Sequence, residues 1–117
     1  MEQIKAKFSV LYSEEADAFL SSLKEKVRTK IISNLRKASY SNDPELFKKL
    51  ESTDIGEFRT RFDGLQYRLL AFWDKTNHKN TLVIATHGFV KKTQKTPKSE
   101  ITHAENIMNV YFNQKRK

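Results

Sequence analysis

Residues 56–73 read GEFRTRFDGLQYRLLAFW, and the rest of the fold can be worked out from this stretch. Side-chain character alternates with a period of two on both sides of Asp63-Gly64, which predicts two β-strands. Asp-Gly between two such runs is typical of a two-residue hairpin turn. The turn predicts a register in which Arg59 lies directly opposite Arg68.

This register places several polar side chains on one face of the hairpin and leaves the other face apolar, as a core surface. The polar residues are Arg59, Arg61, Gln66 and Arg68. Like charges opposite one another on a ladder cost on the order of a few tenths to 1 kcal/mol. We expect acidic side chains to offset little of this repulsion between arginines, because Asp63 lies in the turn and Glu57 lies near the far end of its strand.

An arrangement that costs stability at three positions indicates a function. Guanidinium groups suit phosphate because their planar fork donates two parallel hydrogen bonds. The arginine face is therefore a candidate phosphate-binding site. The alternative is that the three arginines are simply solvated on an open sheet face.

A second basic group follows the last predicted strand, where residues 87–98 read HGFVKKTQKTPK without an acid. In a meander this strand lies beside residues 67–73, so that its end converges on the arginine face. Two threonine hydroxyls and a helix N-terminus opened by Pro97 favour anion binding there. The alternative is a solvated loop. The candidate residues of this segment are Lys91, Lys92, Thr93, Lys95, Thr96 and Lys98.

The pattern outside the hairpin predicts an α+β domain that occupies residues 1–117. The other predicted elements are a strand at 7–12, a long helix or helical hairpin at 13–40 with any break near 23–26, a short helical turn from Pro44 through Leu46 and Phe47, a strand at 81–89, and a helix that starts at Pro97. A polar loop is expected over residues 74–80.

Charge is distributed unevenly along the chain, whose net charge is +8. Residues 1–54 carry ten Lys or Arg against nine Asp or Glu, whereas residues 55–117 carry twelve against five. This asymmetry indicates a polyanionic partner that contacts mainly the second half. A basic surface kept for solubility is the alternative.

Several classes of protein and site are disfavoured. The chain has no cysteine, and its histidines, His78, His87 and His103, lack metal-ligand spacing, so we expect no metal site. No apolar run reaches the length of a membrane span, and the first residues do not resemble a secretory signal. We expect a soluble cytoplasmic protein without a membrane partner. His87 is interpreted either as strand packing or as a proton-transfer group.

The two motifs together resemble a known superfamily. Glu-Phe-Arg-x-Arg-Phe, a two-residue turn and Tyr-Arg-Leu-Leu resemble the central hairpin of the RelE superfamily. His-Gly-Phe-Val-Lys-Lys-Thr-Gln-Lys-Thr-Pro, followed by Glu-Ile, resembles its phage-derived Gp49/HigB branch. The resemblance covers roughly residues 50–112. It implies a RelE-like fold, in which an N-terminal strand and helices pack on a small, mainly antiparallel sheet with a C-terminal helix.

The resemblance also implies an activity, the cleavage of messenger RNA on the ribosome by the toxin of a type II toxin–antitoxin pair. The 2′-hydroxyl attacks the adjacent phosphate, with no metal or cofactor. Arg59 and Arg61 would position the phosphate, and Arg68 would stabilise the transition-state charge. Lys91 or Lys92 matches a further basic residue of the family. The family uses a tyrosine near the chain end for proton transfer. No tyrosine closely follows the last predicted strand here, so His87 or Lys95 would take over that role. Gln66 and the remaining residues of the lysine-rich segment would contact RNA.

The expected partners are the ribosome, messenger RNA and a helix-turn-helix antitoxin of the HigA type, with promoter DNA bound only through the antitoxin complex. Two other functions remain open. One is a poison of DNA gyrase, as in the ParE relatives. The other is a nucleic-acid-binding module without catalysis.

Overall fold

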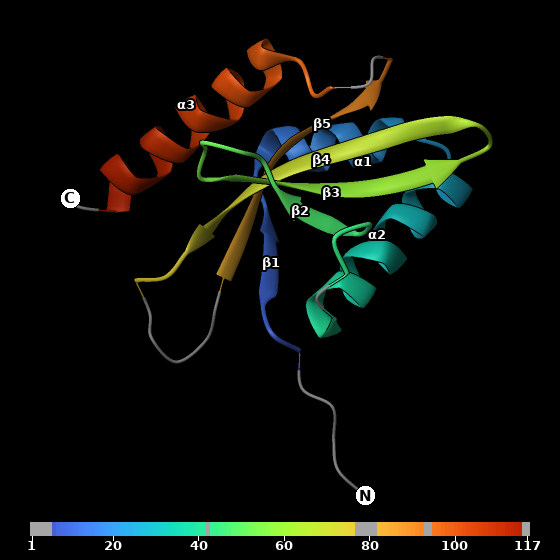
Figure 1. Ribbon diagram of the computed structural model, residues 1–117, viewed down its shortest axis with the longest axis horizontal. Coiled ribbons are helices and arrows are strands. Elements are labelled where there is room, and N and C mark those ends of the chain that lie inside the picture. The colour runs from blue at the N-terminus through green and yellow to red at the C-terminus, as the bar shows by residue number, and fades with distance from the viewer. Residues whose placement is uncertain (1–5, 42, 77–81, 93–94, 116–117) are drawn as a thin grey trace, which may run out of the picture.

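The computed structural model describes residues 6–41, 43–76, 82–92 and 95–115. Over these ranges the chain forms a five-stranded mixed sheet and three helices that pack on it, which confirms the α+β prediction (Figure 1). The elements are β1 (Ser9–Tyr12), α1 (Glu14–Ser22), α2 (Glu25–Tyr40), β2 (Phe47–Lys49), β3 (Ile55–Phe62), β4 (Leu65–Asp74), β5 (Leu82–Lys91) and α3 (Lys98–Lys115). None of these helices is long and apolar enough to cross a membrane.

The sheet has the order β1-β5-β4-β3-β2, with β1 parallel to β5 and the remaining neighbours antiparallel. Its central hairpin has the predicted register, because Arg59 pairs with Arg68. Asp63 and Gly64 have φ angles of 52° and 77°. Two successive positive φ angles are the requirement of a type I′ turn, which Asp-Gly meets at little cost.

The first helical segment consists of two helices, and the break between them falls between Ser22 and Glu25, within the predicted range. The Ser13 side chain caps α1 by accepting a hydrogen bond of 3.1 Å from the backbone N–H of Ala16. The two helices pack on one face of the sheet, where Leu20, Ile31 and other apolar residues meet the apolar face of the β3–β4 hairpin.

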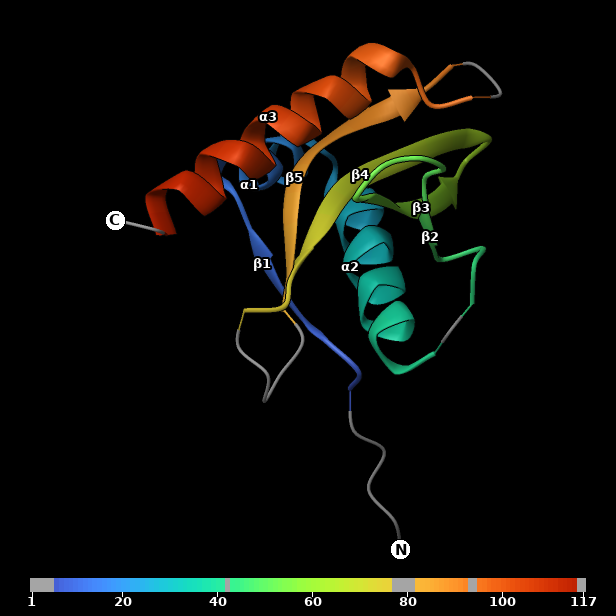
Figure 2. The same ribbon diagram turned by 60° about the vertical axis from the view of Figure 1, so that its left-hand side comes forward.

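The third helix packs on the opposite face of the sheet. Figure 2 shows α2 and α3 on either side of the strands. Ala104 of α3 belongs to a second core cluster with Leu70 and Phe72 of β4. Since side chains two apart share a face, Arg68 and Gln66 continue this same face toward the hairpin turn. The arginine face is therefore the part of the α3 side that lies nearest the turn.

A short helical turn was predicted from Pro44 through Leu46 and Phe47, and the prediction is confirmed only in part. The backbone N–H groups of Leu46 and Phe47 donate to the carbonyl of Asp43, but the turn stops at Leu46. Phe47 begins strand β2, which pairs with residues 56–58 of β3. Its ring stacks on Phe58 with centroids 4.1 Å apart and covers Gly56, where a Cβ atom would lie 2.4 Å from the ring. The missing side chain at Gly56 makes room for an aromatic residue on the neighbouring strand, and local sequence does not reveal this cross-strand contact.

The last strand continues two residues beyond its predicted C-terminal end. Strand β5 extends through Lys91 rather than ending at Phe89, and its far end pairs with the start of β4. Thr81 and part of the predicted polar loop at 74–80 lie outside the described residues. The longer strand carries the first lysine of the lysine-rich segment directly onto the sheet.

Candidate functional site

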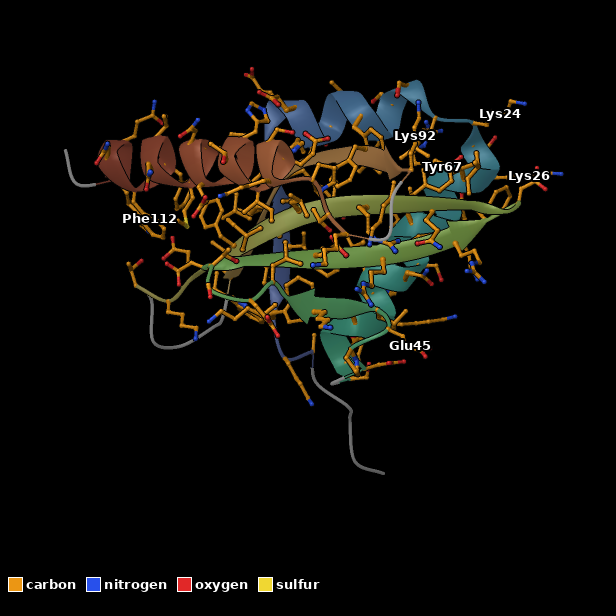
Figure 3. All side chains as sticks on the ribbon, turned by 45° about the horizontal axis from the view of Figure 1, so that its top comes forward. Lys24, Lys26, Glu45, Tyr67, Lys92 and Phe112 are labelled. Carbon is orange, nitrogen blue, oxygen red and sulfur yellow. The ribbon has the colours of Figure 1, made fainter. Side chains whose placement is uncertain are left out.

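Two adjoining hollows open on the arginine face. The first has a volume of about 390 Å³ and the second a volume of about 510 Å³. Figure 3 shows Lys92 and Glu45, which line different hollows, on opposite sides of the β3–β4 hairpin. The side chains common to both hollows are Arg59, Gln66 and Arg68. The predicted arginine face is thus a concave basic surface, and Arg61 lines its first hollow.

The end of β5 brings lysines to this surface, as the meander predicted. Lys91 pairs with Gln66 on β4 and is half-buried, whereas Lys92 is exposed. Both lysines line the second hollow. Paired residues share a face of the sheet, so Lys91 lies on the arginine face with Gln66 and Arg68.

The central residue of the cluster, Glu57, was missed. Its side chain is 0% exposed, and its Oε1 lies 3.1 Å from Nε of Arg59 and 3.1 Å from Nε of Arg68. Glu57 was expected near the far end of its strand and too distant to offset the arginines, and that expectation is wrong. The signal was present in the alternation by two, which puts Glu57 on the same face as Arg59 and diagonally next to Arg68.

The three arginines have different environments. Arg68 is only 7% exposed, and its terminal nitrogens donate to the carbonyl of Tyr67 at 3.1 Å and to Oε1 of Gln66 at 2.5 Å. The Arg59 side chain is 31% exposed, and Arg61 is exposed. Arg68 therefore forms the floor of the basic surface, while Arg59 and Arg61 present charge to a ligand.

Burial and neighbouring charge lower two pKa values here. For Arg68, burial is the main cause of the lowered pKa, with Arg59 and Arg61 adding to it and Glu57 opposing it. For Lys91, burial again comes first, and the nearby arginines and Lys48 add to it while Glu57 opposes it. A lysine with a lowered pKa gives up its proton more readily than an ordinary one, which suits it to proton transfer.

The lysine-rich segment contacts the site through a threonine. The hydroxyl of Thr96 donates a hydrogen bond to Oε2 of Glu57. Lys95 and Lys98 are exposed on either side of it, and Thr93 lies outside the described residues. Through this hydrogen bond, Thr96 in the segment between β5 and α3 contacts the acid at the centre of the arginine cluster.

His87 lies on the same face of the sheet as Arg68 but lines neither hollow. It pairs with Leu70, is 7% exposed, and its ring centroid lies 4.6 Å from that of His103 on α3. Its Nε2 lies 3.4 Å from Oε1 of Glu100. This position fits strand packing, and a role for His87 in proton transfer remains only a prediction. No group of three or more His, Asp or Glu side chains in the described ranges could hold a metal ion.

A family model described as phage-derived protein Gp49-like (DUF891) matches residues 18–109. The matched range contains the β3–β4 hairpin and the whole lysine-rich segment. A search of curated proteins finds no match to the chain.

Proposed function

Because this chain belongs to the phage-derived Gp49-like family, which is a RelE/ParE-like toxin family, we propose that it is a ribosome-dependent messenger RNA endoribonuclease. Membership in a toxin family implies an antitoxin partner. In this proposal the antitoxin is a helix-turn-helix protein of the HigA type, and the sheet with its three helices is a RelE-like fold.

One observation supports the nuclease most strongly: the cations gathered in and beside the two hollows. Arg59, Arg61 and Lys91 line them above the buried floor formed by Arg68. A phosphodiester being cleaved accumulates negative charge, and preorganised cations aimed at that charge are commonly the largest catalytic contribution. A gyrase poison does not need such a cluster.

The proposed reaction is transesterification within the RNA. The 2′-oxygen attacks the adjacent phosphorus while its proton passes to solvent water, the bond to the 5′-oxygen of the next nucleotide breaks, and a 2′,3′-cyclic phosphate and a free 5′-hydroxyl result. Arg59 and Arg61 hold the non-bridging oxygens, and Arg68 supports the charge from beneath. Lys91 protonates the leaving 5′-oxygen, because its lowered pKa makes it a better proton donor than an exposed lysine.

The other basic residues would hold the flanking RNA. Lys92, Lys95 and Lys98 are exposed beside the second hollow or along the segment that leaves it. Exposed lysines bind phosphates as mobile point charges without reading sequence. Codon preference would then come from the ribosome and from contacts near Gln66.

The proposal is tested by mapping RNA 5′ ends in cells after induction of wild type, Arg61→Gln and Lys91→Gln. These variants are chosen over changes at Arg68, since Arg68 is buried and its loss would also threaten folding. Arg36→Gln is the matched control, because Arg36 is an exposed arginine on α2, away from the hollows. We expect wild type and the control to produce codon-phased cuts, and both site variants to lose at least about 90% of them, as a positioned acid or charge is worth 10²-fold or more.

Two outcomes would contradict the proposal. Growth arrest without new RNA ends would exclude the nuclease and make DNA gyrase the next target to assay. Equal cutting by wild type and both site variants would place the active site elsewhere on the molecule.

A further inference from the structure

Glu57 is a buried carboxylate at the centre of a basic cluster. An isolated carboxylate in this position would be strongly unfavourable, so its contacts explain why it can stay there. Arg59 and Arg68 approach Oε1, and Thr96 donates to Oε2. Both oxygens are therefore engaged, which makes Glu57 better suited to holding other side chains than to accepting a proton from a substrate.

The contacts to the two arginines share a distance but differ in kind: Arg59 donates a hydrogen bond from Nε, whereas Nε of Arg68 forms an ion pair with Glu57 and no hydrogen bond to any described residue. Each is made through the Nε atom, at 3.1 Å, rather than through the terminal nitrogens. A guanidinium is rigid and planar, so an anchor at Nε limits the directions in which its terminal N–H groups can point. For the partly exposed Arg59, this anchor leaves the terminal nitrogens for a bidentate contact with phosphate.

The second oxygen connects the arginines to another part of the site. Thr96 lies in the segment between β5 and α3, and it is 39 residues away from Glu57 in the sequence. Since this segment also carries lysines, a single carboxylate links the hairpin arginines to the lysine-rich segment. Loss of Glu57 would remove its contacts with both arginines and with Thr96, although Arg68 would keep its hydrogen bonds to Tyr67 and Gln66.

We propose that Glu57 is a positioning residue of the nuclease, which orients Arg59 and Arg68 for the transition state. This inference rests on the proposed function. A simpler role would be to neutralise part of the cluster's charge. The two roles predict opposite results, because a neutralising acid weakens RNA binding, whereas a positioning acid raises the rate of the chemical step.

The kinetic test uses two variants of the full chain in a ribosome-dependent cleavage assay. Glu57→Gln keeps the shape and removes the charge, whereas Glu57→Asp keeps the charge and shortens the reach. We expect kcat to fall about 10- to 100-fold in both, as misplacement of a catalytic group by about 1 Å can cost 10²-fold, with KM within about threefold of wild type. Glu51→Gln, which removes an exposed charge outside the hollows, should leave both constants unchanged.

The result that overturns the proposal is specific. If Glu57 only neutralises charge, Glu57→Gln will bind RNA more tightly and cleave at least as fast, and Glu57→Asp will match wild type. A melting temperature close to that of wild type is required for each variant compared. Glu57→Asp retains the charge beside the buried Arg68, so it remains a usable test if Glu57→Gln does not fold.

A spectroscopic measurement separates this inference from the proposed function. In ¹⁵N-labelled wild type, two Nε–H signals should be slow to exchange: that of Arg59, which is hydrogen-bonded to Glu57, and that of Arg68, which is buried beside Glu57. Glu57→Gln should move both signals, whereas Glu51→Gln should move neither. Unchanged signals would contradict the positioning role. If wild type shows these signals but cleaves no RNA, the arginines are held as described but the proposed nuclease, and with it a role for Glu57 in that reaction, is wrong.

Discussion

At the scale of single residues, Asp74 shows how one buried charge anchors the end of a helix. It lies at the end of β4 and is 1% exposed. Tyr111 donates to it at 2.5 Å, Thr76 donates at 2.6 Å, and Lys115 of the last turn of α3 forms an ion pair with it. Burial alone would raise the pKa of this carboxyl, but the hydrogen bonds from Lys115, Thr76 and Tyr111 outweigh burial and hold the pKa well below its usual range.

We predict that Asp74→Asn lowers the free energy of unfolding by about 2–3 kcal/mol at pH 7, the scale of hydrogen bonds to a buried charge. A carboxyl whose pKa is depressed by folding stabilises the protein above its unfolded pKa of about 3.9, and this contribution is lost as the pH falls below that value. The deficit of Asp74→Asn should therefore shrink at pH 3. Urea unfolding at both pH values measures it, with Glu51→Gln as a control expected to change stability by less than about 0.5 kcal/mol. An equal deficit at both pH values would show that the charge of Asp74 contributes nothing.

At the scale of elements, β2 is held to the edge of the sheet by aromatic packing over a glycine. Phe47 stacks on Phe58 and makes an edge contact with Trp73 at 5.8 Å. Its ring occupies the space that a side chain at Gly56 would need. A strand of three residues has few ladder hydrogen bonds, so this packing is the main reason that residues 47–49 form a strand.

We predict that Gly56→Ala destabilises the protein by about 1–3 kcal/mol, the usual cost of overpacking a filled core. Adding Phe47→Leu should recover part of this loss, because a smaller side chain leaves room for the new methyl group. The double-mutant cycle, measured by urea unfolding, should show a coupling of about 1 kcal/mol or more. Additive effects would mean that Phe47 and Gly56 do not share this contact.

At the scale of the whole molecule, a pair of neighbouring histidines, His87 and His103, connects elements on both faces of the sheet. His87 of β5 lies against Glu100 and His103 of α3, its Nδ1 is 3.1 Å from the hydroxyl of Thr86, and His103 pairs with Glu15 of α1 at 2.6 Å. Burial is the main cause of the lowered pKa of His87; His103 adds to it, and Glu100 and Glu15 oppose it.

We predict that stability falls as the pH drops below about 6.5, the pKa of an unfolded histidine, because the unfolded chain takes up a proton that folded His87 resists. In His87→Gln, which cannot be protonated, the change in unfolding free energy between pH 7.5 and 5.5 should be smaller than in wild type. Urea unfolding at the two pH values measures it, with Glu51→Gln as the control. The same variant should keep most of its RNA cleavage if His87 only packs, whereas a loss of two orders of magnitude would support proton transfer.

Much of the architecture depends on signals between neighbours in the sequence. Asp63-Gly64 and the alternation around it predicted the hairpin, its register and the arginine face, because turn chemistry and strand pleat act within a few residues. Helical spacing and its interruption predicted α1 and α2 in the same way. These signals need no knowledge of distant segments, and the structure bears them out.

Tertiary structure alone decided which polar groups lie inside the site. Arg61 and Arg68 look alike in the sequence, yet one is exposed and the other is buried against Glu57. Thr96 reaches Glu57 only because β5 and the segment after it return across the sheet. Burial and pairing depend on which distant segments cover a residue, so the local pattern determined the face on which each charge lies, and the folded chain determined its partner.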